Sequence, residues 1–137
     1  MFIKDCHFLV ILSSYAKSHF CKYFSKKYSQ EQWNITWENI KNSLERSYLY
    51  QNKTSFSVIN FSQEKSGGIF KLEFRVAGTK FSTKTSGNRV VFFLDNEKEL
   101  IEILLVYGKT HAAKQNETQW IKEQIKANFL KYKKYCV

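Results

Sequence analysis

An alternating stretch in the middle of the chain constrains the fold most. It runs from Ile69 to Arg89 and reads IFKLEFRVAGTKFSTKTSGNR. Its first part alternates apolar and charged residues, in the order Phe70, Lys71, Leu72, Glu73, Phe74, Arg75 and Val76. Because successive side chains of a strand point to opposite faces, this pattern predicts a strand with one apolar face and one charged face.

The same stretch is strongly basic. Its cations are Lys71, Arg75, Lys80, Lys84 and Arg89, and its one carboxylate is Glu73. A half-buried strand that carries cations on its solvent face is a candidate site for a polyanion, and we expect Arg89 on that exposed side. The alternative is that these charges only keep one face of a sheet hydrated. Charge alone leaves both interpretations open.

The first half of the chain predicts one strand and a helix hairpin. The apolar run Phe8 to Leu12 predicts a buried strand over residues 7–13, and helical spacing of apolar residues predicts a helix over residues 14–28. Ser29 and Gln32 have the spacing of a capping box, which begins a second helix that ends near Tyr48. A stripe of Trp33, Trp37, Ile40 and Leu44 is typical of the core of such a hairpin.

The second half predicts strands and a final helix. An extra strand is expected within 55–61, a turn at 63–68, and further strands over 69–76, 89–95 and 100–107. The last two strands form a hairpin through the turn at 95–98, and the strand over 100–107 is so apolar that both of its faces should be covered. Asn116 caps a last helix, and the basic tail over 131–137 is expected to fray.

This order of elements predicts an α+β fold in a single domain over residues 1–137. The sheet should be small and mostly antiparallel, with about four or five strands. The N-terminal helix hairpin should pack on one face, and a C-terminal helix should complete the domain. We expect the helices to share one face, which would leave the cationic face partly open.

Composition narrows the partners and the location. The chain has 22 Lys and Arg against 12 Asp and Glu, a net charge of +10, which favours nucleic acid, an anionic membrane or an acidic protein as partner. Cys6, Cys21 and Cys136 are widely spaced, and the three histidines are scattered. We therefore expect reduced thiols, a cytoplasmic protein, and neither a metal site nor a cofactor. No apolar run approaches the ~20 residues that span a bilayer, so we expect no transmembrane segment, and a membrane is not among the partners that we expect.

Four segments resemble a known family. They are FKLEFRV, SGNRVVFFLD and ILLVYGK, together with the N-terminal ILSSYAKSHFCKYFSKKY. Over Gly68 to Phe129 the chain resembles the RelE/ParE superfamily of bacterial toxins and, within it, the HigB-like branch. The resemblance implies the same order of elements and the toxin of a type II toxin-antitoxin system, held silent by a cognate antitoxin.

The resemblance also implies an activity. Many such toxins are ribosome-dependent mRNA endonucleases that cut without a metal, by attack of a ribose 2′-hydroxyl on the neighbouring phosphate. That chemistry needs a base for the 2′ proton, cations for the charge on phosphorus, and an acid for the leaving 5′ oxygen. The partners implied are the antitoxin and mRNA on the ribosome.

Candidate site residues follow from the match. Arg75 and Arg89 fall on recurrent arginines of the family and are candidate phosphate ligands, because a guanidinium binds phosphate bidentately. Lys71 falls at a position that is often basic, while Lys80 and Lys84 match the basic loop of HigB-like members. We expect these three lysines to bind RNA.

The candidates for proton transfer are less well defined by the family. Glu73 departs from the basic pattern, and it is either a base or a neutralising partner of its basic neighbours. Lys109 matches the lysine after the last strand. His111, two residues on, is the nearby side chain with an ordinary pKa near neutrality, although isolated surface histidines are often idle. Tyr107 is expected to pack at a strand end rather than to take part in chemistry.

Two alternatives remain from the same residues. In the ParE-like branch the toxin inhibits DNA gyrase without being a nuclease, and the weakness of any single catalytic residue here fits that reading. An inactive RNA-binding relative is the other alternative, motivated by Glu73 and Thr110 at positions that are often basic or polar in active members.

Overall fold

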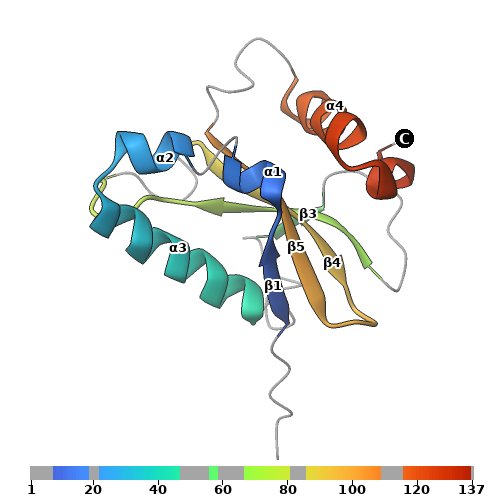
Figure 1. Ribbon diagram of the computed structural model, residues 1–137, viewed down its shortest axis with the longest axis horizontal. Helices are drawn as coiled ribbons and strands as arrows, with labels where there is room; N and C mark the ends of the chain where they lie inside the picture. The colour runs from blue at the N-terminus through green and yellow to red at the C-terminus, as the bar shows by residue number, and fades with distance from the viewer. Residues whose placement is uncertain are drawn as a thin grey trace, which may run out of the picture.

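The computed structural model describes residues 8–18, 22–46, 56–58, 67–80, 86–108 and 116–136. Its elements in chain order are β1 Leu9–Leu12, α1 Ser14–Ala16, α2 Lys22–Lys27, α3 Gln30–Glu45, β2 Phe56–Val58, β3 Gly67–Phe74, β4 Asn88–Asp95, β5 Leu100–Gly108, α4 Glu117–Asn128 and the 3-10 helix η4 Leu130–Tyr135 (Figure 1).

The strands form one sheet of five in the order β1-β5-β4-β3-β2. β1 pairs parallel to β5, and the other neighbours pair antiparallel. The predicted α+β class with a mostly antiparallel sheet is therefore confirmed. The hairpin between β4 and β5 is also confirmed, and β5 is buried from Ile103 to Gly108, as its apolar sequence predicted.

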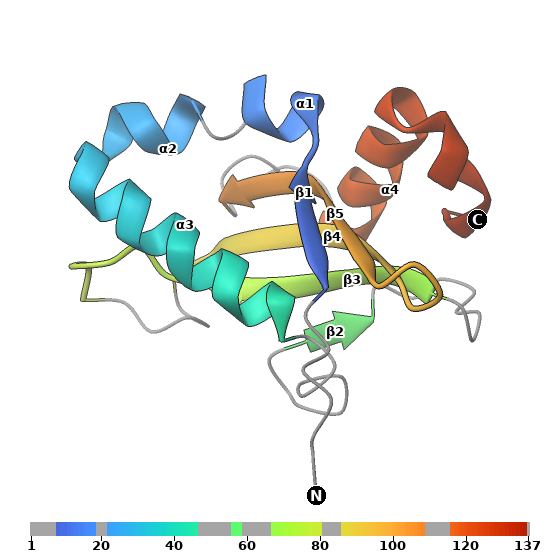
Figure 2. The same ribbon diagram turned by 60° about the horizontal axis from the view of Figure 1, so that its bottom comes forward.

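Helices cover both faces of the sheet, and this corrects the expectation that they share one face. Phe74 of β3 lies 5.7 Å from the Phe24 ring of α2 on one face. On the opposite face, the Phe93 ring of β4 stacks on Tyr132 of η4, with ring centroids 4.4 Å apart. The register pairs Phe74 with Asn88, so Phe93 points to the other side of the pleat. Figure 2 shows the sheet between α3 and α4.

The α3 face is a continuous apolar layer. Ser29 begins α3 with the predicted capping box, in which its side chain and that of Gln32 each accept from the other's backbone N–H. Ile40 and Leu44 are buried beneath α3, and Trp33 packs against the core from the same helix. The predicted helix stripe is therefore confirmed as core.

The first strand is less buried than its sequence suggested. β1 lies at an edge of the sheet, and Leu9 and Ile11 are 64% and 42% exposed. Val10 and Leu12 pack against the core instead. The expectation of a fully buried strand was wrong because an unbroken apolar run does not distinguish an edge strand from a central one. The predicted helix over 14–28 appears as α1 and α2, with residues 19–21 outside the described part.

Two further predictions need correction. Gly67 and Gly68 do not form a turn, because they are already part of β3; a Cβ on Gly67 would lie 2.2 Å from the Leu94 carbonyl oxygen, so this close approach requires glycine. The basic tail does not fray over its described residues. Tyr132 and Tyr135 of η4 are buried against the sheet, and these two rings hold the tail in place.

Candidate functional site

A group of charged residues lies at one end of the sheet face that α4 covers. The residues are Lys71 and Glu73 of β3, Arg89 of β4, Tyr107 of β5 and Glu117 of α4, and we call them the charged cluster. The strand register places Glu73 opposite Arg89, and Arg89 opposite Tyr107. The alternation of β3 therefore brings its charged side chains onto the α4 face rather than onto open solvent.

Lys71 is held by a carboxylate from the start of α4. Its Nζ donates to Glu117 Oε2 at 3.0 Å. The two side chains are 20% and 26% exposed, so the ion pair borders solvent. Glu117 is the first residue of α4, and Asn116 caps that helix through a hydrogen bond from the Gln119 N–H, as predicted. A helix N-terminus favours a negative charge, so Glu117 is stabilised by its own helix as well as by Lys71.

Arg89 is buried, which corrects the expectation that it lies on the solvent-facing side. The residue is 8% exposed. Its Nη1 donates to the Asn88 carbonyl at 2.9 Å, and its Nη2 lies 3.6 Å from Glu73 Oε1. At that distance the contact with Glu73 is an ion pair without a good hydrogen bond. Among the described residues, no group accepts a hydrogen bond from Arg89 Nε, although that atom is buried.

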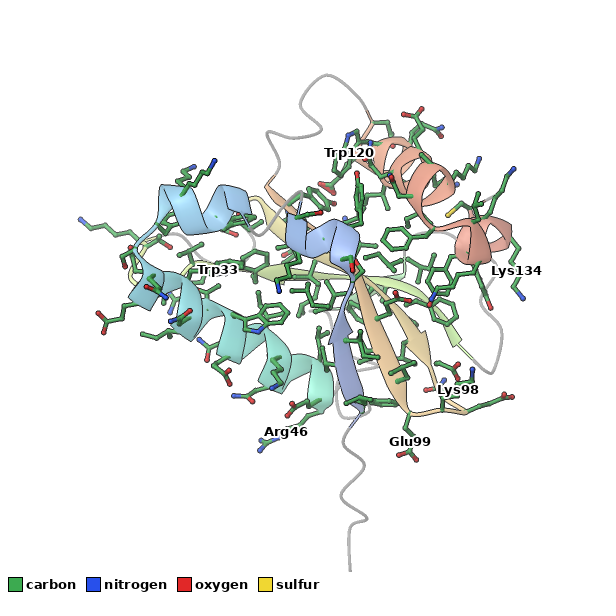
Figure 3. The ribbon with its side chains drawn as sticks, viewed as in Figure 1. Trp33, Arg46, Lys98, Glu99, Trp120 and Lys134 are labelled. Atoms are coloured by element: carbon green, nitrogen blue, oxygen red, sulfur yellow. The ribbon has the colours of Figure 1, made fainter. Side chains whose placement is uncertain are left out.

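Tyr107 closes the inner side of the cluster. Its ring is fully buried and lies 4.9 Å from that of Trp120, which Figure 3 labels near the start of α4. Its hydroxyl group is buried and makes no hydrogen bond of good geometry with the described residues, although the Glu117 carboxylate lies near it. Burial raises the pKa of Tyr107 well above its ordinary value, and the Glu117 carboxylate raises the pKa further against the opposing effect of Arg89. The phenol is therefore protonated at neutral pH and can act as a hydrogen-bond donor.

Arg75 and Lys80 lie outside the charged cluster. Arg75 follows β3, is exposed, and lines a small cleft of about 180 Å³ together with Thr36 and Ile40 of α3. Lys80 is exposed in the loop after β3. That loop is joined to α3, because the Ala77 N–H donates to Thr36 Oγ1 at 2.8 Å. Among the described residues, Arg89 therefore contacts the Glu73 side chain and not that of Arg75.

Three predicted site residues cannot be placed. Lys84, Lys109 and His111 lie outside the described residues. The described residues that flank this part of the chain are Gly108, which follows Tyr107 of the cluster, and Asn116, which precedes Glu117.

Comparison with known proteins identifies one similar structure. No protein-family profile matches this chain, and no curated protein matches it in sequence. Among solved structures, the chain is similar to a mutant of the E. coli toxin RelE in the free state, with 16% identity and a TM-score of 0.49. The match covers 90% of this chain and 99% of the toxin chain. At this identity and TM-score, the likeness assigns neither a family nor an activity.

Two other findings bear on the classes of function. Within the part of the chain that the structure describes, no three His, Cys, Asp or Glu residues come together as a set of metal ligands. No described helix is both long enough and apolar enough to cross a membrane.

Sequence reasoning missed Glu117 and set Tyr107 aside. An acidic residue directly after a capping asparagine is common at helix starts, so the Glu117 position alone indicated no site. Its pairing with Lys71 joins residues 46 positions apart, which no local pattern reveals. The signal at Tyr107 was a phenol at the end of a strand that is almost entirely apolar, since a buried tyrosine hydroxyl needs a partner.

Proposed function

We propose that this single-domain chain is the toxin of a type II toxin-antitoxin system, of the RelE/ParE superfamily and its HigB-like branch. We further propose that it cuts mRNA on the ribosome, in the cytoplasm. The observation that carries the proposal is the charged cluster. It gathers Lys71 and Arg89 on adjacent strands, beside a carboxylate that can accept a proton. The resemblance of the strand sequences to this family supports the same conclusion.

The cluster supplies groups suited to metal-free cleavage of RNA. The ribose 2′ oxygen attacks the neighbouring phosphorus and forms a new O–P bond, while the bond from phosphorus to the 5′ oxygen breaks. Glu73 would take the 2′ proton, and its carboxylate lies 3.6 Å from the guanidinium of Arg89. Arg89 and Lys71 would hold the added negative charge on phosphorus. A proton for the leaving oxygen would come from Lys109 or His111.

Outside the cluster, the exposed cations would guide RNA to the site. Arg75, Lys80 and Lys84 are the candidates, since a basic surface concentrates polyanions. With a net charge of +10, the chain also suits an acidic antitoxin segment as its inhibitor.

The experiment is induction of the gene followed by mapping of mRNA ends. We expect translation to stop, and new 5′ ends to appear inside translated codons. Glu73→Gln should abolish the cuts while the protein stays folded, because Glu73 is partly exposed and its pair with Arg89 is long. The matched control is Glu123→Gln, which removes the same charge from an exposed position on α4. Intact message during growth arrest would contradict the nuclease proposal.

One observation favours a second candidate, a protein that binds without cutting. Both cations of the cluster already have carboxylate partners, Lys71 with Glu117 and Arg89 with Glu73. Such a chain could inhibit gyrase in the ParE manner or bind RNA passively. Inhibition of supercoiling by purified protein would support the gyrase inhibitor. RNA binding without cleavage, with a salt slope near −0.7 per neutralised phosphate, would support the passive binder.

A further inference from the structure

The start of α4 places a negative charge where an RNA phosphate would bind. Glu117 holds Lys71 at 3.0 Å, and its carboxylate lies at the N-terminus of a helix of 12 residues. Both the lysine and the helix end attract an oxyanion, whether it is a side chain or a phosphate. The pair borders solvent, so a ligand can reach Lys71 without unfolding the helix.

Two buried donors beside this ion pair have no partner among the described residues. They are Arg89 Nε and the Tyr107 hydroxyl. Arg89 is 8% exposed and Tyr107 is fully buried. A buried polar group without a partner is destabilising, so two such donors in one cluster indicate a site for an oxygen-rich ligand.

The ion pairs in the cluster are unequal. The Lys71 pair is a direct hydrogen bond, whereas the contact of Arg89 with Glu73 is 3.6 Å long and involves one oxygen. Arg89 therefore keeps hydrogen-bonding capacity for a ligand while it remains in place. The charge of Lys71 is compensated more directly, because its ammonium group already donates one hydrogen bond to Glu117.

We infer that Glu117 is a built-in competitor for RNA: its carboxylate occupies Lys71 in the free protein, and an RNA phosphate replaces it. This inference rests on the proposed RNA binding by the cluster and adds a regulation of that site. The incoming phosphate would accept hydrogen bonds from Lys71 and from the free donors of Arg89 and Tyr107. Glu117 thereby weakens RNA binding, and the protein holds RNA less tightly than its charge would allow.

The test measures the affinity for a short oligouridylate by fluorescence anisotropy. Glu117→Gln removes the competing charge and should tighten binding about two- to fivefold, which corresponds to the energy of a partly exposed ion pair. Glu123→Gln is the matched control. It removes an equal charge from the same helix, from an exposed residue that accepts a weak hydrogen bond from Gln119 at 3.4 Å. It should leave the affinity within about 1.5-fold of wild type, because distant surface charges are screened at physiological salt.

A second background identifies the residue for which Glu117 competes. In a Lys71→Gln protein, adding Glu117→Gln should give no further gain in affinity, since no ammonium group is left to release. This double variant also tests the inference if Glu117→Gln alone folds poorly, because it leaves neither charge of the pair without its partner.

The outcomes separate this inference from the nuclease proposal. Equal gains in affinity from Glu117→Gln and Glu123→Gln would overturn the competition. A gain in affinity from Glu117→Gln that persists in the Lys71→Gln protein would also overturn it. So would a failure of every variant to bind oligouridylate. If message is cut in cells but Glu117→Gln brings no gain, the nuclease stands and the competition fails. If the gain appears without any cut message, the competition stands and the nuclease fails.

Discussion

The two faces of the sheet are built from different chemistry. Under α2 and α3, the rings of Phe24, Trp33 and Phe74 pack together with centroids 5.1 to 6.5 Å apart. The buried polar residue on that side, Thr36, has both a donor and an acceptor contact. Under α4, ion pairs and donors without described partners lie at one end of the face, and aromatic rings lie at the other. The α3 face is therefore built for apolar packing alone, whereas the α4 face also holds polar groups that stability does not require.

The largest expected effect is on the α3 face. Leu44→Ala removes a fully buried side chain and should lower the free energy of unfolding by about 2–5 kcal/mol. Ile35→Ala is the control, because Ile35 lies on the same helix but is 47% exposed, and its cost should stay below about 1 kcal/mol. Urea unfolding measures both. Similar costs for the two variants would contradict an α3 face that carries the core.

A smaller loss is expected in the charged cluster. Arg89→Ala should lower the free energy of unfolding by about 1–3 kcal/mol, because it leaves Glu73 without its cation. The loss stays below that of a fully buried pair because Glu73 is 29% exposed. Glu73→Gln in the same background should recover part of the loss in a double-mutant cycle of urea unfolding. Strict additivity would show that the two residues do not interact.

Alkaline pH tests the far end of the α4 face. The Tyr132 hydroxyl donates to Glu102 at 2.5 Å, and burial together with this bond raises the pKa of Tyr132 above its ordinary 10.0. The folded protein therefore retains a proton that the unfolded chain loses, so this stability is present below pH 10 and declines above it. Tyr132→Phe should cost about 1–2 kcal/mol at neutral pH and should decline less steeply above pH 10. In the Tyr132→Phe protein, part of the decline in stability at alkaline pH should remain, because the pKa of Tyr107 is also raised by folding. Parallel pH profiles for the two proteins would contradict this role of Tyr132.

The smallest effect is expected at the surface of the same end. Lys131 binds Glu102 at 2.9 Å, but its side chain is 64% exposed. Lys131→Ala should change the free energy of unfolding by less than about 0.5 kcal/mol, because water competes for both charges. Thermal or urea unfolding measures this change in the free energy of unfolding. A loss as large as that of Arg89→Ala would show that the buried and the exposed ion pair contribute equally to stability.

Sequence reasoning found the elements of the fold but not the layer that covers the site. The alternation from Phe70 to Val76 correctly separated an apolar from a charged strand face, and the caps at Ser29 and Asn116 begin the helices they predicted. The sequence of α4 shows that it has an apolar side, yet not which sheet face receives that side. Arg89 is buried because α4 packs on its face of the sheet, and the same strand position would be exposed if α4 packed on the other face.

We propose that RNA binds at the charged cluster, and that basic charge elsewhere on the protein does not account for this binding. Lys71→Gln and Lys131→Gln test it directly, because both lysines lie on the α4 face, each paired with a carboxylate, and each variant removes one positive charge. We expect Lys71→Gln to weaken oligouridylate binding about tenfold, by loss of a phosphate contact, and Lys131→Gln to leave it within about twofold of wild type. Equal losses of affinity from the two variants, or no loss from Lys71→Gln, would contradict RNA binding at the charged cluster.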